Sequence, residues 1–121
     1  MEVQVFGTRK HAGTRAALRF FAERRIRTHF VDFAVRAASL GELRRFAQLA
    51  GAQGLVDRDS RRFAELGLGA ALLSDEAWLR RLADEPLVLV QPLVRWKHRV
   101  TVGPAENTWR DWVAGARLEG A

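Results

Sequence analysis

The residues best suited to chemistry gather near the N-terminus. His11 follows Arg9 and Lys10, and Arg15 comes four residues after it. Guanidinium and ammonium groups pair with phosphate, sulfate or carboxylate, and the first amides of a helix also attract anions. An imidazole adds a charge that depends on pH. The candidate anion-binding set is Arg9, Lys10, His11, Ala12, Gly13, Thr14 and Arg15, although a solvated loop without a ligand is the favoured interpretation.

Cysteine is absent from the chain. This absence excludes a disulfide framework, a thiolate metal site and a cysteine nucleophile. The three histidines, His11, His29 and His98, are 18 and 69 residues apart, and these spacings match no compact metal motif. We therefore expect no metal and no cofactor, and we expect His29 to be a partly buried strand residue.

Paired carboxylates suited to acid–base catalysis are rare in this chain. Asp57 and Asp59 flank an arginine, and Asp75 and Glu76 lie where a helix begins. Acids are common in the first turn of a helix because they favour its dipole. We expect neither pair to be catalytic. The chain has no glycine-rich phosphate loop and no Gly-x-Ser-x-Gly motif.

Positive charge dominates, with 20 Lys and Arg against 14 Asp and Glu and a formal net charge of +6. Only Lys10 and Lys97 are lysines, so 18 of these residues are arginine. The arginines are scattered along the chain rather than gathered in one block, so direct nucleic-acid binding is not the expected function. No apolar run approaches the roughly 20 residues that span a bilayer, and no signal peptide is evident. We therefore expect a cytoplasmic protein without a membrane partner.

Trp96 has an unusually cationic setting, since Arg95, Lys97, His98 and Arg99 surround it. Such a hairpin tip could stack a nucleobase or anchor a partner. The alternative, which we favour, is that Trp96 packs against the last helix.

The elements that must position these residues follow from periodicity and capping signals. We expect a strand at 2–6, a helix at 12–25 that Thr8 could cap, and a strand at 26–33. This order predicts a parallel pair of strands joined by a helical crossover. Ser39 and Glu42 form a capping box for a helix that Gly51 ends. The remaining expected elements are short helical pieces at 54–56 and 60–66, a helix at 75–85, a strand buried on both faces at 87–90, a hairpin at 93–96 and 99–102, and a helix at 105–114. We expect a single α/β domain over residues 1–121 with a helical insert at about 39–85.

Four stretches, in this order, resemble the arsenate reductases of the ArsC type and the Spx regulators. They are residues 6–15, a loop between strand and helix; residues 59–68, ending in Glu65-Leu66-Gly67-Leu68; residues 85–94, ending in Gln91-Pro92-Leu93-Val94; and residues 99–103, Arg99-Val100-Thr101-Val102-Gly103. The resemblance spans nearly the whole chain. It implies a thioredoxin-like fold, a mixed β-sheet with flanking helices and a helical insert, in which Pro92 is the cis-proline that faces the first loop.

The chain departs from this family where the family does its chemistry. The family's nucleophilic cysteine falls on His11, and the second cysteine of the Spx type falls on Thr14. The three arginines that hold the oxyanion in the reductases fall on Asp57, Gln91 and Gly103, while Arg15 does match the family. Because an imidazole cannot perform thiol–disulfide exchange, the resemblance implies the scaffold and argues against the reductase reaction.

The expected function is therefore a non-catalytic binding or regulatory protein of the ArsC/Spx type. One alternative is an Spx-like transcriptional regulator that contacts RNA polymerase. The other is an enzyme, related to arsenate reductase or of another kind, that uses His11 and Arg15 on a small oxyanion. The expected partners are thus a small oxyanion or a protein such as RNA polymerase.

Overall fold

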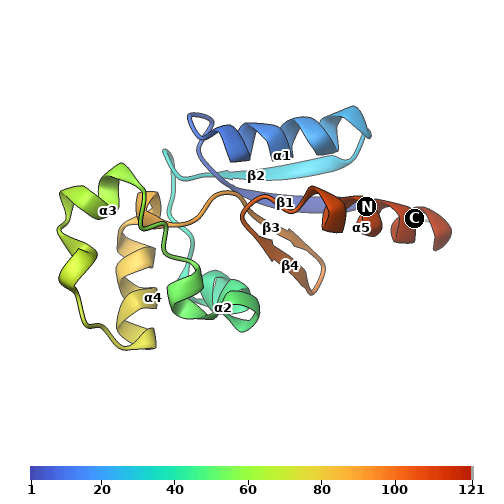
Figure 1. The fold of residues 1–121 in the computed structure, drawn as a ribbon. Coiled ribbons are helices and arrows are strands. Elements are labelled where there is room, and N and C mark those ends of the chain that lie inside the picture. The colour runs from blue at the N-terminus through green and yellow to red at the C-terminus, as the bar shows by residue number, and fades with distance from the viewer. Residues whose placement is uncertain (121) are drawn as a thin grey trace.

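The computed structural model describes residues 1–120. Its centre is a four-stranded sheet with the strand order β2-β1-β3-β4. β1 (Glu2–Gly7) runs parallel to β2 (Arg27–Asp32), and α1 (Ala12–Glu23) connects the two strands (Figure 1). β3 (Leu93–Trp96) lies antiparallel to β1 and forms a hairpin with β4 (Arg99–Val102). The predicted parallel pair and hairpin are both present.

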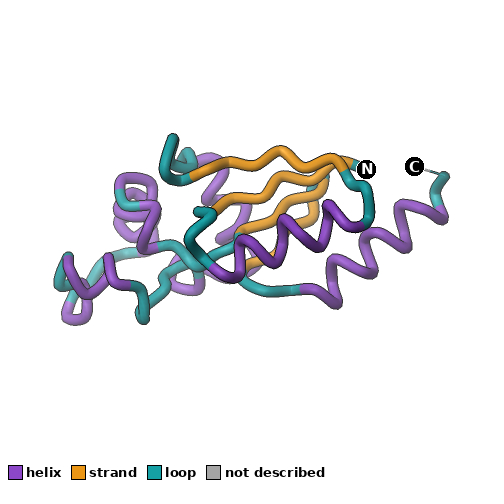
Figure 2. The backbone as a smooth tube through the Cα atoms, turned by 90° about the horizontal axis from the view of Figure 1, so that it is seen from above, coloured by secondary structure: helices purple, strands orange, loops and turns teal. Residues whose placement is uncertain are grey.

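Both faces of the sheet are covered by helices. The face that includes Val3 and Val5 packs against α1 and α5 (Glu106–Leu118), which lie side by side in Figure 2. The opposite face includes Phe6 and packs against the helices between β2 and β3. These helices are α2 (Leu40–Gly54), α3 (Arg61–Glu65) and α4 (Asp75–Asp84), with a short 3₁₀ turn, η1 (Leu68–Ala70). Alternation of side chains along a strand thus produces two separate apolar clusters.

Capping residues define the helices between β2 and β3. Ser39 and Glu42 form the predicted capping box, in which each side chain accepts a hydrogen bond from the other residue's backbone amide. Ser60 and Ser74 cap α3 and α4 in the same way, through their hydroxyl oxygens. Gly51 has φ 75° and ψ 162°, which interrupts the regular helix at the predicted residue. Local sequence is thus sufficient to locate these helix starts.

The strand predicted at 87–90 is wrong. η2 (Pro86–Val88) is a 3₁₀ turn, and Leu89 next to it forms an isolated antiparallel bridge with Val56 rather than part of a strand. The apolar run is not buried on both faces, because the Leu87 side chain is 47% exposed while Val88 and Leu89 are buried among the insert helices. An apolar run of this length does not by itself distinguish a strand from a buried turn.

Two helix boundaries also differ from expectation. α1 ends at Glu23 rather than at residue 25, and α5 continues to Leu118 because Val113 and Ala116 extend its buried stripe. The expected helical piece at 54–56 is instead the end of α2 followed by the Val56 bridge. None of the helices in the described part of the chain has the length and apolarity needed to cross a membrane.

Candidate functional site

The loop from β1 to α1 is held in shape by its own backbone. The amide of His11 donates a hydrogen bond to the carbonyl oxygen of Thr8 at 3.1 Å. Nη1 of Arg15 donates to the carbonyl oxygens of Arg9 and Lys10, at 2.9 and 2.8 Å. The guanidinium that matches the resembled family therefore fastens this loop to the first turn of α1.

His11 is the N-cap of α1. Its backbone is extended, with φ −85° and ψ 126°, and its Nδ1 atom accepts a hydrogen bond from the amide of Gly13 at 3.0 Å. In this arrangement Nδ1 is the acceptor, so the proton of the neutral ring lies on Nε2. The imidazole thus occupies a helix-start amide that would otherwise be available to an anion.

The expected cap, Thr8, is a wrong prediction. Its hydroxyl donates to Oε1 of Gln91 at 3.3 Å, and its position three residues before the N-cap puts it in the loop itself. Histidine is an uncommon N-cap, so a search for Ser, Thr, Asp or Asn does not find it.

Gln91 is the residue that joins the loop to the rest of the sheet. Its Oε1 atom accepts hydrogen bonds from the amide of Thr8 at 2.7 Å and from the hydroxyl of Thr14 at 3.1 Å. The Thr14 side chain is fully buried and Gln91 is 6% exposed. The peptide bond that follows, Gln91–Pro92, is cis. One buried amide side chain therefore connects the end of β1, the first turn of α1 and the segment that enters β3.

The backbone approaches this group closely at Gly7. A Cβ atom at Gly7 would lie 2.2 Å from the Thr14 hydroxyl oxygen and 2.9 Å from Oε1 of Gln91. The family resemblance places Gln91 before the cis-proline, where it implies an arginine, and it does not predict this structural role. The signal for its structural role is a polar side chain between the apolar run at 87–90 and Pro92, because a buried polar group requires a partner.

A cleft of about 440 Å³ lies beside the loop. Its lining residues are Thr8, Arg9, Lys10, Asp32, Phe33, Ala34 and Leu87. The guanidinium of Arg9 lies over the Phe30 ring, 4.7 Å from its centroid, and Lys10 is exposed. His11, Thr14 and Gln91 do not line this cleft, so the sequence-predicted anion set is divided between an open cleft and a closed hydrogen-bond group.

The other residues singled out from sequence lie elsewhere. His29 is exposed on the edge strand β2, which corrects the expectation of partial burial. His98 lies in the hairpin turn between β3 and β4, at the end of the sheet opposite the loop that contains His11. Over residues 1–120 no three histidine, aspartate or glutamate side chains gather in a group that could hold a metal ion. Asp57 accepts a hydrogen bond from the amide of Asp59 at 3.0 Å, and Gly103 has φ 77°.

The carboxyl groups with displaced pKa values lie outside the loop. Partial burial alone would raise the pKa of Glu42, but hydrogen bonds from the Arg36 guanidinium and the Ser39 amide bring it below its ordinary value. The pKa of Glu85 is lowered by hydrogen bonds from the Arg62 guanidinium, 2.9 and 3.1 Å away. Each ion pair includes a carboxylate of the helical insert, and among residues 1–120 neither pair contacts the first loop.

The comparisons with known proteins agree on one family. The chain is 33% identical over 110 residues to an arsenate reductase of Neisseria meningitidis serogroup A, covering 88% of this chain and 94% of the relative. No family model matches the chain.

Two solved structures have the same fold. An arsenate reductase from Vibrio cholerae superposes with a TM-score of 0.76 and 22% identity, covering 89% of this chain and 94% of that one. The YffB protein superposes with a TM-score of 0.80 and 18% identity, covering 90% and 96%. The predicted thioredoxin-like fold of the ArsC type, a mixed sheet with flanking helices, is therefore confirmed.

Proposed function

The chain belongs to the arsenate reductase (ArsC) family and contains no cysteine, and from this premise we propose that it is a binding or regulatory protein that does not reduce arsenate. A reductase of this kind needs a thiolate that attacks the substrate and is later regenerated by a second thiol. This chain has no thiol to offer at any position.

The hydrogen bond of His11 carries this proposal. The imidazole that stands where the resemblance implies a nucleophile accepts the Gly13 amide through Nδ1 at 3.0 Å. Its role is that of a helix cap, which is a structural role. The same is true of Thr14 and Gln91, whose side chains are buried and bonded to each other. Residues that satisfy one another in this way are less available to a substrate.

Arsenate reductase activity is the direct test. The purified protein is incubated with arsenate and either glutathione with glutaredoxin or thioredoxin with its reductase, and NADPH consumption is followed. The Neisseria meningitidis relative is the positive control. We expect no turnover above the protein-free background, and turnover by the wild-type chain would overturn the proposal.

A His11→Cys variant extends this test. It restores a thiol at the implied position but leaves Asp57, Gln91 and Gly103 where the resemblance implies arginines. We expect the variant to react with a thiol-alkylating reagent and still not reduce arsenate, since the groups that would hold the oxyanion are absent. Rapid turnover by the variant would show instead that the site is otherwise intact.

Anion binding by the first loop is the second candidate, and one observation favours it. Arg9 and Lys10 place two cations on the open cleft beside the loop. Titration with arsenate, phosphate and sulfate at low salt tests this candidate. In isothermal titration calorimetry, binding that weakens about tenfold in a Lys10→Ala variant would support this candidate. The absence of any heat of binding with all three anions would eliminate it.

The RNA polymerase partner implied by the resemblance to Spx needs its own experiment. The tagged protein is mixed with purified polymerase from the source organism, and the complex is sought by gel filtration. Co-elution would support a regulatory role in transcription, and separate elution would remove this form of the proposal.

A further inference from the structure

β4 leaves one edge of the sheet unpaired. Within residues 1–120 β4 pairs with β3 alone, and the hairpin turn between them consists of Lys97 and His98. In a hairpin with a two-residue turn, the backbone groups of the flanking pair, Trp96 and Arg99, form hydrogen bonds with each other. The backbone N–H and C=O groups of the next residue in β4, Val100, then point away from β3. The backbone N–H and C=O groups of Val100 and Val102 are therefore directed to the open side of β4.

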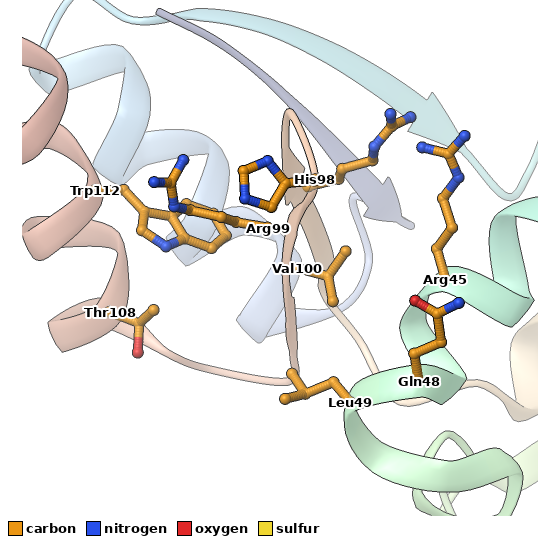
Figure 3. A pocket seen from close by; sticks show the side chains of 9 residues that line it. Arg45, Gln48, Leu49, His98, Arg99, Val100, Thr108 and Trp112 are labelled. Atoms are coloured by element: carbon orange, nitrogen blue, oxygen red, sulfur yellow. The ribbon is translucent and has the colours of Figure 1, made fainter.

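A cleft of about 600 Å³ adjoins this edge. Figure 3 shows Arg45, Gln48 and Leu49 of α2 on one side of the hairpin, and Thr108 and Trp112 of α5 on the other. Because α2 and α5 cover opposite faces of the sheet, the cleft is a groove with the free edge along its floor. We call this the β4 groove, and its remaining lining residues are Arg95, His98, Arg99 and Val100.

The charge of the β4 groove has one sign. Its lining includes three arginines and a histidine and no aspartate or glutamate. Arg45 is exposed and makes no hydrogen bond or ion pair with any side chain among residues 1–120. Nε of Arg95 donates to the carbonyl oxygen of Lys97 at 2.7 Å, and the Arg99 guanidinium lies 4.7 Å from the centroid of the Trp96 ring. None of these cations is neutralised by an acid in the groove, so the groove favours a negatively charged occupant.

Two other occupants fit this surface poorly. A second copy of the chain pairing through β4 would place one arginine-lined groove beside another, and like charges placed together are unfavourable. A single-stranded nucleic acid binds by stacking its bases on exposed aromatic rings. Trp96 is 3% exposed and Trp112 is 7% exposed, so neither indole offers a free face.

We propose that the β4 groove binds an extended acidic segment of another protein, which adds to the sheet as a fifth strand. The backbone of the segment pairs with Val100 and Val102, and its carboxylates meet Arg45, Arg95 and Arg99. Strand addition gives affinity through the main chain, and the flanking side chains give the preference for acidic sequences. This site lies at the end of the sheet opposite the first loop, because the hairpin turn is next to the N-terminal end of β1.

Fluorescence anisotropy with labelled peptides tests the proposal on the intact chain. The probe is a short peptide of alternating glutamate and valine. The first control peptide replaces glutamate with lysine, and the second keeps glutamate but is N-methylated at alternate residues so that it cannot pair as a strand. We expect the unmodified glutamate–valine peptide to bind well at low salt and the lysine peptide not to bind. The N-methylated peptide should bind at least about tenfold more weakly than the unmodified peptide.

Protein variants locate the binding. Arg45→Glu and Arg99→Glu each weaken binding of the acidic peptide by about tenfold or more, whereas Arg61→Glu, on an exposed arginine of α3 with no partner among the described side chains, has no effect. Circular dichroism melts verify that each variant is folded. Val100→Pro also abolishes binding, and because the Val100 amide faces away from β3 the hairpin tolerates the change.

Several results would overturn the proposal. Equal binding of the N-methylated peptide would mean that charge alone attracts it. Equal loss with Arg61→Glu would place the site elsewhere. Tighter binding of a single-stranded oligonucleotide than of the acidic peptide would identify a nucleic acid as the occupant. Dimerisation of the wild-type chain that the Arg45→Glu substitution alters would identify a second copy of the chain.

Discussion

The hydroxyl of Thr14 donates a hydrogen bond to Oε1 of Gln91 across 3.1 Å, and both side chains are buried. Seventy-seven residues of chain separate the two. The resemblance to the family implies a cysteine at the first position and an arginine at the second. The chain instead has a neutral donor and a neutral acceptor that satisfy each other. This hydrogen bond explains how two polar side chains can be buried beside the first loop. Substitution of either residue should therefore lower the free energy of unfolding.

Gln91→Leu removes the acceptor while keeping a similar volume. The Thr14 hydroxyl and the Thr8 amide then lose their partner in a buried setting, which costs about 1–3 kcal/mol of the free energy of unfolding. Urea denaturation measures the loss. Gln48→Leu, at an exposed position of α2, is the control and leaves the unfolding midpoint nearly unchanged. Equal stability of the two variants would contradict the assigned role of Gln91.

His11→Ala removes the cap of α1. We expect a loss of about 1 kcal/mol in the free energy of unfolding, because the Gly13 amide loses its acceptor. His11→Asp restores most of the loss, since a carboxylate is a favoured N-cap and suits the helix dipole. Thermal and urea unfolding of these variants, with Lys10→Ala as a control for the loop, check this. If His11→Asp is no more stable than His11→Ala, capping is not what His11 contributes.

Thr101→Val tests the contact between β4 and α5. Nε1 of Trp109 donates to the Thr101 hydroxyl at 2.8 Å, and both residues are buried. Valine has nearly the same shape but cannot accept, so the indole N–H is left without a partner at a cost of about 1–3 kcal/mol. Thr108→Val, on the exposed side of α5, is the matched control. Similar stabilities would show that the indole finds another acceptor.

The free energy of unfolding should fall in acid. The pKa values of Glu42 and Glu85 are lower in the folded chain than the ordinary value of 4.5. A carboxyl group with a lowered folded pKa binds fewer protons when folded than when unfolded, so its stabilisation is complete above the unfolded pKa. The stabilisation is lost as the pH falls through the folded pKa.

Urea unfolding between about pH 7 and about pH 3 measures this dependence. Glu85→Gln makes the decline shallower because it removes one of the two groups. Glu23→Gln, at an exposed site without an ion pair among the described residues, serves as the control. The same acid slope in wild type and Glu85→Gln would contradict the assigned effect of the Arg62 pair.

Helix starts were predictable where one short segment contains the whole signal. The capping box of Ser39 and Glu42 and the break at Gly51 both appear at the expected residues. The hairpin follows from its apolar strands and short turn. Trp96 packs beside Trp112 at 6.0 Å between ring centroids, as favoured from the sequence.

Errors arose where distant segments compete for the same residues. The apolar run at 87–90 has the composition of a strand, yet β3 at Leu93 already occupies the place beside β1, and the run packs among insert helices instead. His29 was expected to be partly buried because it lies in a strand, but β2 is an edge strand and leaves the His29 side chain exposed.

The sequence by itself determined that this chain has no thiol chemistry, that its charge is positive and arginine-rich, and that its elements alternate as a thioredoxin-like fold requires. These properties depend on composition or on a few neighbouring residues. Only the tertiary structure decided that His11 is a cap, that Gln91 holds Thr8 and Thr14, and that Arg45 and Arg99 flank the same open edge. The last two relationships join segments far apart in the chain, and no local preference specifies which buried donor will meet which acceptor. The His11 cap is local, through the Gly13 amide two residues on, but histidine is not among the residues that a search for N-caps favours.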